Sequence, residues 1–309
     1  MNIDRQEALN LLAERASLMA KGDAPHLAAQ HLPENIDSLT DIAYLSDGMD
    51  EHLLDIYRPQ KMSNGEALPV FIDFHGGGLY YGSKENNLCR DMILAGKGFV
   101  VVNANYRLVP QVEFFDQIRD ALAVMTWVRD HIAEYQGDPD QVFITGDSAG
   151  ATLAMYTLAV NNSKVVRQSW FMQSSGLNVR GFVATSGMFR LEGGVYEPLI
   201  SYYTTAYFAK PSEIIAIAPY KNDLDRLVVD GNLPPTYLIT SAEDVLADNS
   251  LELARIMVHR HHDCELRMWP LGQGKVLGHI FNVTQAGNED NHEALEVIDD
   301  IARFARRYL

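Results

Sequence analysis

The pentapeptide GDSAG, residues 146–150, places a serine between two glycines where an apolar run ends and a helix-like segment begins. This G-x-S-x-G spacing is typical of a nucleophile elbow, a tight strand–turn–helix in which the serine hydroxyl is exposed. Glycine suits the flanking positions because strand and helix approach each other closely there. We therefore predict that Ser148 is a nucleophile, and the alternative is a glycine-rich turn with a capping serine.

A serine hydroxyl needs a general base to take its proton and a third group to orient that base. In folds with a nucleophile elbow, an acidic residue and then a histidine follow the serine along the chain. Asp244 comes just after an apolar run, where a strand would end, and we predict that it is the acid. Asp248 is the main alternative. A solvated loop or helix-capping role is the other interpretation of these two residues and of Glu243.

Five histidines follow the predicted acid, and we predict that His279 is the base because a glycine-rich loop after a strand carries it. The cluster HRHHDC, residues 259–264, closes a predicted helix, where cationic side chains are favoured, and we interpret it as surface rather than a metal site. His292 begins a charged, helix-like segment. The segment GQGKVLG, residues 272–278, lacks the spacing of a phosphate-binding loop.

Acyl transfer also needs hydrogen-bond donors where negative charge develops on the carbonyl oxygen. Three glycines follow His75 directly behind an apolar run, and glycine lets backbone amides face a substrate without an obstructing side chain. We predict that the amides of Gly77, Gly78 and Ala149 form an oxyanion hole. Gly76 would shape the turn and His75 would brace it. The alternative is a plain glycine turn at a strand end.

These residues can meet only if a sheet brings the ends of several strands to one edge. From residue 69 onwards, six apolar runs alternate with amphipathic segments, and two short strand-like segments precede them, residues 41–46 and 52–59. Continuous apolar runs between helices are typical of parallel strands covered on both faces, whose carboxyl ends share an edge. We predict an α/β fold with a mostly parallel sheet of about eight strands and helices on both faces. The expected helices are residues 86–97, 115–135, 149–160 and 249–259.

Two further segments indicate a cap over this edge. The first forty residues have helical periodicity, and residues 190–230 form an aromatic-rich stretch longer than a plain crossover requires. We expect both to cover a single domain of residues 1–309. Aromatic side chains in such a segment more often form the core of the cap than line a pocket. The aromatic residues proposed for a substrate pocket are Tyr80, Tyr81 and Tyr207.

Composition disfavours several classes of partner. The chain has 309 residues, 47% hydrophobic and 21% charged, and a formal net charge of -16, which would repel nucleic acid, anionic membranes and strongly anionic substrates. Two cysteines in a chain of this size suit a reducing compartment. The amino-terminal segment lacks the apolar stretch of a signal peptide or membrane span. We expect a cytoplasmic enzyme for a small-molecule ester, without metal or cofactor, and a homodimer is left open.

The motifs together resemble the hormone-sensitive-lipase-like branch of the α/β-hydrolase fold, over about residues 52–282. Those that carry the resemblance are HGGG at 75–78, YRLVP at 106–110, GDPDQVFITGDSAGA at 137–151, LPPTYLITSAEDVLAD at 233–248 and GHIF at 278–281. The resemblance implies a serine carboxylesterase with an N-terminal cap that acts on short acyl esters. It implies the same triad, Ser148, Asp244 and His279, and the same three oxyanion amides.

Three departures and two alternative functions accompany the resemblance. The loop GQGKVLGH, residues 272–279, is longer than a minimal strand-to-histidine turn. This chain has QVEFFDQ where the family commonly has a glutamate and further prolines, and Val245 where proline is frequent. An amidase or aryl-formamidase would use the same triad. A non-catalytic receptor on this scaffold, as in the plant gibberellin receptor, lacks the catalytic histidine, and His279 argues against that alternative.

Overall fold

One eight-stranded sheet forms the centre of the molecule, and its strand order is β1-β2-β4-β3-β5-β6-β7-β8. A computed structural model of the chain describes residues 3–61, 65, 67–192, 199–221, 223–271, 276–288 and 290–309. The predicted fold class is confirmed. The strands are β1 (Ile36–Ala43), β2 (Leu53–Pro59), β3 (Leu68–Phe74), β4 (Val100–Ala104), β5 (Gly137–Asp147), β6 (Val179–Thr185), β7 (Thr236–Ser241) and β8 (Cys264–Trp269).

The sheet is antiparallel only at the edge formed by β1 and β2. β1 pairs with β2 and β2 with β4 in antiparallel register, and every later neighbour is parallel. The prediction of helical structure through residue 40 is wrong for residues 36–40. Residues 36–43 form an edge strand, because pairing with β2 satisfies their backbone groups and buries Ile36, which local periodicity does not reveal.

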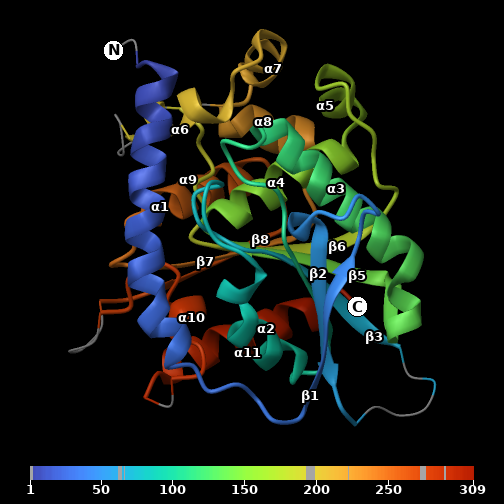
Figure 1. Ribbon diagram of the computed structural model, residues 1–309. Helices are drawn as coiled ribbons and strands as arrows, with labels where there is room; N and C mark the ends of the chain where they lie inside the picture. The colour runs from blue at the N-terminus through green and yellow to red at the C-terminus, as the bar shows by residue number, and fades with distance from the viewer. Residues whose placement is uncertain are drawn as a thin grey trace.

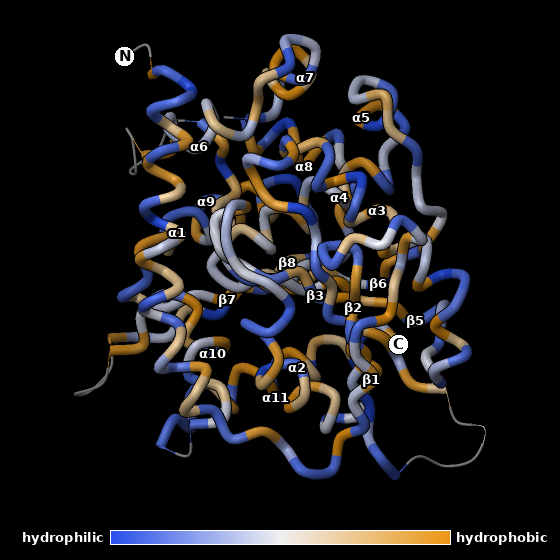
Figure 2. The backbone as a smooth tube through the Cα atoms, in the orientation of Figure 1, coloured by the Kyte–Doolittle hydropathy of each residue, from blue (hydrophilic) through white to orange (hydrophobic). Residues whose placement is uncertain are grey.

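Helices cover both faces of the sheet (Figure 1). α2 (Leu88–Ala95) and α11 (His292–Arg306) lie on one face, and α3 (Phe114–His131), α4 (Ala149–Asn162), α8 (Leu224–Gly231) and α9 (Ala247–His259) lie on the other. The strands are buried on both sides: Val70 and Ile72 pack into the core beneath α4, while Phe71 packs into the core beneath α11. The strands near the middle of the molecule are accordingly largely orange in Figure 2. The short helices are α5 (Lys164–Ser169), α6 (Leu199–Tyr207), α7 (Pro211–Ile217) and α10 (Phe281–Thr284).

The first helix, α1 (Arg5–Ala28), runs along one side of the molecule from α6 to α10 (Figure 1). At its amino-terminal end, Glu7 accepts a hydrogen bond of 2.9 Å from the Tyr202 hydroxyl, and Arg5 donates to the Ala206 carbonyl at 3.3 Å. Beyond its carboxyl end, Gln30 donates to the Val283 carbonyl. Hydrogen bonds to α6 and α10 therefore fix α1 beside the carboxyl edge of the sheet. Of the helices described, none has the length and apolar character needed to cross a bilayer.

Candidate active site

Ser148 occupies the sharp turn between β5 and α4, with φ 49° and ψ -118°. Such a conformation is unfavourable for a residue with a side chain, and the close packing around it maintains it. A side chain at Gly150 would place its Cβ 1.9 Å from the Phe74 carbonyl oxygen, and one at Gly146 would place it 2.7 Å from the Gly150 carbonyl carbon. The Ser148 amide donates to the Thr185 carbonyl of the neighbouring strand β6 at 2.8 Å. The turn therefore has the nucleophile-elbow geometry expected from its sequence.

Three predicted residues from distant parts of the chain form one hydrogen-bonded series. His279 Nε2 lies 2.9 Å from Ser148 Oγ, and His279 Nδ1 lies 2.9 Å from Asp244 Oδ1. A carboxylate can only accept, so Nδ1 carries the proton and the lone pair of Nε2 faces the serine hydroxyl. This is the tautomer that a general base requires.

The loops that carry the acid and the histidine are held to each other. Asp244 is buried after β7 and also accepts the amide of Leu246 at 2.7 Å. Glu243 accepts the amide of Leu277 at 2.6 Å, and the Ser241 hydroxyl donates to the Gly278 carbonyl at 3.0 Å. Asp248, the alternative acid, is exposed in the first turn of α9. Hydrogen bonds at Leu277 and Gly278 thus hold the loop that carries His279. Residues 272–275 of the GQGKVLG segment lie outside the described residues.

The glycine loop after β3 leaves two amides available. Gly77 has φ +106° and Gly78 has φ +63°, the left-handed region that favours glycine. Among the described residues, neither amide donates a hydrogen bond. Ala149 begins α4, so its amide has no acceptor within the helix. These are the three amides predicted for the oxyanion hole, and Gly78, Ala149 and Ser148 line one cavity.

The carbonyl groups of the glycine loop all have donors, which fixes its direction. His75 Nδ1 donates to the Gly76 carbonyl at 2.7 Å, and the Gly77 carbonyl accepts the amides of Tyr80 and Tyr81. Burial lowers the pKa of His75 to about 4, so this imidazole is neutral at ordinary pH. The sequence-based expectation that His75 braces the loop agrees with this contact.

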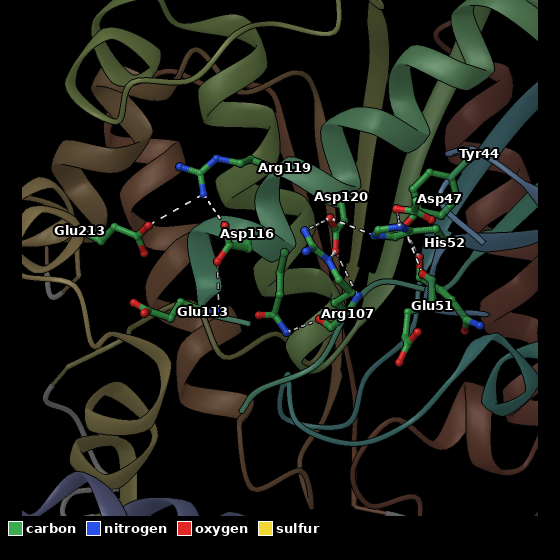
Figure 3. Close-up of polar contacts among 12 residues, drawn as sticks. Tyr44, Asp47, Glu51, His52, Arg107, Glu113, Asp116, Arg119, Asp120 and Glu213 are labelled. Atoms are coloured by element: carbon green, nitrogen blue, oxygen red, sulfur yellow. Dashed lines mark hydrogen bonds and ion pairs between the residues drawn. The ribbon is translucent and has the colours of Figure 1, made fainter. Parts of the chain in front are cut away.

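A second layer of polar contacts supports the glycine loop from α3, and Figure 3 shows the part of it formed by Arg107, Asp120 and His52. Gln117 donates to the Leu79 carbonyl at 2.8 Å and to the Arg107 carbonyl at 2.9 Å. Arg107, from the YRLVP motif, donates three hydrogen bonds to the buried carboxylate of Asp120, two from its guanidinium and one from its backbone amide. This carboxylate also lies 3.4 Å from His52 Nε2. The YRLVP motif thus connects the glycine loop to α3 and does not contact the candidate nucleophile.

A buried carboxyl group lies beneath the same loop. Asp147 Oδ1 accepts the Gly76 amide at 3.1 Å and the Asn87 side-chain amide at 2.7 Å. The same Asn87 nitrogen contacts Asp73, which pairs with Arg90. Burial, followed by the charge of Asp73, raises the pKa of Asp147 to about 6, and Arg90 opposes the shift. The Gly76 amide is therefore hydrogen-bonded to Asp147 and is not free to bind a substrate.

Two cavities meet at His279. One, of about 210 Å³, includes Ser148 and has a largely apolar wall from α1, α6 and the loop before α9. The other, of about 190 Å³, lies on the side of Gly76 and Gly77 and has a more polar wall. Met19 of α1 borders both. The arrangement offers separate spaces for the two parts of an ester.

The three predicted pocket tyrosines lie in different places. Tyr80 borders the first cavity and Tyr81 borders the second. Tyr207 lies outside the walls of both, because it is fully buried in α6 and its hydroxyl donates to the Gly78 carbonyl at 2.6 Å. Tyr207 therefore holds the glycine loop from behind.

A family model described as alpha/beta hydrolase fold matches residues 71–273. This chain belongs to the α/β-hydrolase family. Curated relatives include the esterase LipQ of Mycobacterium tuberculosis, 26% identical over 77% of this chain and 55% of the relative. The carboxylesterase NlhH of the same species is 26% identical over 80% of this chain and 74% of the relative. The chain thus spans about half the length of LipQ.

Solved structures agree with this family. Esterase B from Lactobacillus rhamnosis superposes with a TM-score of 0.87 at 25% identity, covering 99% of this chain and 96% of that one. A second structure of that esterase, described as inhibited with a C4-C4 SN3 tributyrin phosphonate, gives a TM-score of 0.88. The resemblance to hormone-sensitive-lipase-like carboxylesterases of the α/β-hydrolase fold is confirmed.

Sequence reasoning missed the supporting residues of this α/β-hydrolase site. Asn87 lies just before α2 and Gln117 lies on α3, where polar residues give no local signal, and only the fold brings them beneath the loop. Arg15 and Met19 of α1 border the serine cavity although the helix is far from the motifs in sequence. A cation on an otherwise apolar face of α1 was the one available indication for Arg15.

Proposed function

We propose that this chain is a serine carboxylesterase that uses Ser148, His279 and Asp244 as its catalytic triad. The series of 2.9 Å contacts from Asp244 through His279 to Ser148 is the observation that carries the proposal. His279 takes the hydroxyl proton as Ser148 attacks the ester carbonyl, and Asp244 stabilises the imidazolium. The amides of Gly77, Gly78 and Ala149 then bind the oxyanion.

The reaction proceeds in two steps. The tetrahedral intermediate collapses as His279 gives its proton to the leaving alcohol, which leaves an acyl group on Ser148. Water then loses a proton to His279 and attacks the acyl-enzyme, and the acid is released. All of these residues are present in the chain, so the proposed mechanism requires no cofactor.

A short acyl chain fits the serine cavity best. Its volume of about 210 Å³ compares with about 150 Å³ for a cavity that holds a benzene ring. We propose that α1 and α6 form the cap that closes this cavity over the sheet edge. A profile of initial rates on nitrophenyl esters from acetate to decanoate should peak among the shorter chains.

The triad assignment is tested by replacing Ser148. Ser148→Ala should lower kcat on nitrophenyl butyrate by at least about four orders of magnitude without changing the circular dichroism spectrum. Ser17→Ala, which removes an exposed hydroxyl on α1, is the matched control and should keep full activity. Retained hydrolysis by Ser148→Ala would refute the assignment.

The choice between ester and amide substrates is tested with the same protein. Amide cleavage passes through the same intermediate but requires a poorer leaving group to be protonated. We expect the unmodified enzyme to hydrolyse nitrophenyl acetate far faster than the corresponding acetanilide or formanilide. A reversed order of kcat/KM would identify an amidase.

A further inference from the structure

Among the described residues that border the serine cavity, Arg15 is the only charged one. The cavity wall is otherwise made of apolar side chains, two tyrosines and the candidate catalytic groups. It includes Met19, Met188, Leu199, Ile200, Val245 and Leu246. A guanidinium in such a wall is unusual because its partial burial removes water without providing an anion.

The described contacts of Arg15 are with two tyrosines. Its Nε donates to the Tyr80 hydroxyl at 3.4 Å, and its guanidinium carbon lies 5.9 Å from the centre of the Tyr203 ring. Within the described part of the chain, no carboxylate forms an ion pair with it. Its neighbours one turn away on α1 are all leucine or methionine, so the helix itself supplies no acidic partner.

Further donors lie beside this cation. The Tyr80 and Tyr203 hydroxyls are 3.3 Å apart, and both residues border the same cavity as Arg15. A carboxylate is a preferred ligand of a guanidinium, which binds it with two parallel N–H groups, and phenol hydroxyls can complete its shell. The cavity therefore combines an apolar wall with a group of donors suited to one anion.

We propose that the serine cavity accepts an acyl chain that ends in a carboxylate, so that Arg15 selects monoesters of aliphatic dicarboxylic acids. This inference rests on the proposed esterase function. The acyl part is assigned to this cavity because Gly78 and Ala149, whose amides would hold the acyl carbonyl oxygen, border it. The overall charge of -16 slows the approach of anions, but it acts at a distance and is screened, whereas Arg15 acts in contact.

The experiment compares two ethyl esters with acyl chains of equal carbon number, monoethyl adipate and ethyl hexanoate, in a pH-stat. The measured quantity is the ratio of their kcat/KM values, which is insensitive to the fraction of folded enzyme. Arg15→Gln should lower the ratio of adipate to hexanoate by about 10- to 100-fold, the range expected for loss of a charge-assisted hydrogen bond. Arg15→Lys should recover part of it, because the charge is kept and the paired geometry is lost.

Two further proteins make the test selective. Arg15→Glu should reverse the preference, favouring ethyl 6-aminohexanoate over monoethyl adipate. Lys21→Gln removes the same charge from an exposed position on the same helix and should leave the ratio as it is in the unmodified enzyme.

The failures of the two proposals are distinguishable. Absence of any ester hydrolysis by the unmodified enzyme would refute the esterase function. Hydrolysis of both esters with the same ratio in the unmodified enzyme, Arg15→Gln and Arg15→Glu would refute the role of Arg15 and leave the esterase function standing. The proposal would also be overturned if Arg15→Gln lowered kcat/KM only for ethyl esters of neutral acids. It would equally be overturned if Arg15→Gln lowered kcat/KM for 4-acetoxybutyrate but not for monoethyl adipate, because the carboxylate would then lie in the alcohol part of the ester.

Discussion

Asp147 precedes the candidate nucleophile, and one of its carboxyl oxygens accepts hydrogen bonds from Gly76 of the glycine loop and from the side chain of Asn87. With a pKa of about 6 in the folded protein and about 4 in the unfolded chain, this carboxyl group binds its proton more tightly when folded. Between those values the unfolded chain has already released the proton. The contribution of Asp147 to the free energy of unfolding is therefore full below about pH 4 and is lost as the pH rises through 6.

Asp147→Asn should remove this dependence while keeping an oxygen that accepts from Gly76 and Asn87. We expect the free energy of unfolding of the variant, relative to that of the unmodified protein, to increase by roughly 2 to 3 kcal/mol between pH 4 and pH 7. Urea unfolding at several pH values measures it. Asp50→Asn, at an exposed position, is the control and should give a flat difference. A flat difference for Asp147→Asn as well would contradict the buried, raised pKa.

A substitution at Gly77 tests the proposed oxyanion hole. A Cβ there would lie 2.0 Å from the Tyr81 carbonyl oxygen, in a backbone conformation with φ +106°. Gly77→Ala should therefore displace the loop and lower kcat by about 100-fold or more, the usual effect of losing one oxyanion donor. Gly98→Ala is a matched control, with φ +94° and no atom within 4 Å of its Cβ, at the opposite end of the strands. Equal losses of kcat in both variants would show that backbone strain alone is responsible.

At the scale of elements, α6 reaches the oxyanion loop through one hydroxyl. Tyr207→Phe leaves the half-buried Gly78 carbonyl without its 2.6 Å donor, so we expect about 1 kcal/mol less free energy of unfolding and a several-fold lower kcat. Tyr202→Phe on the same helix removes only a hydrogen bond to Glu7 in solvent and should change both quantities little. Thermal unfolding and initial rates of the two variants provide the comparison. Identical kcat values would mean that α6 does not hold the loop.

The predictability of these elements differs for physical reasons. β5 and the elbow at Ser148 are specified locally, by an apolar run followed by small residues, and strands such as β3 read as continuous apolar segments. β1 was missed between residues 36 and 40 because an edge strand is half exposed and its pairing partner lies elsewhere. Asp244 and His279 were placed by strand ends and chain order. The positions of Arg15, Asn87 and Tyr207 depend on helix packing, which no local pattern encodes.

The whole molecule carries a formal net charge of -16, which opposes compactness by self-repulsion. Raising NaCl from about 10 mM to about 150 mM shortens the screening length to about 8 Å. We expect the melting temperature to rise by about 1 to 3 °C over this range, as followed by circular dichroism. A falling melting temperature would mean that surface ion pairs such as Arg190–Glu252 contribute more than the repulsion between like charges.

The position of α1 also bears on how such proteins diversify. The candidate catalytic residues follow β5, β7 and β8. By contrast, α1 is held by hydrogen bonds to α6 and α10 and contributes to the walls of both cavities. One part of the cavity wall is thus encoded in a stretch of the chain separate from the candidate catalytic residues. Exchanging this amino-terminal helix between related proteins should transfer selectivity as a module, with the hydrolytic machinery inherited unchanged.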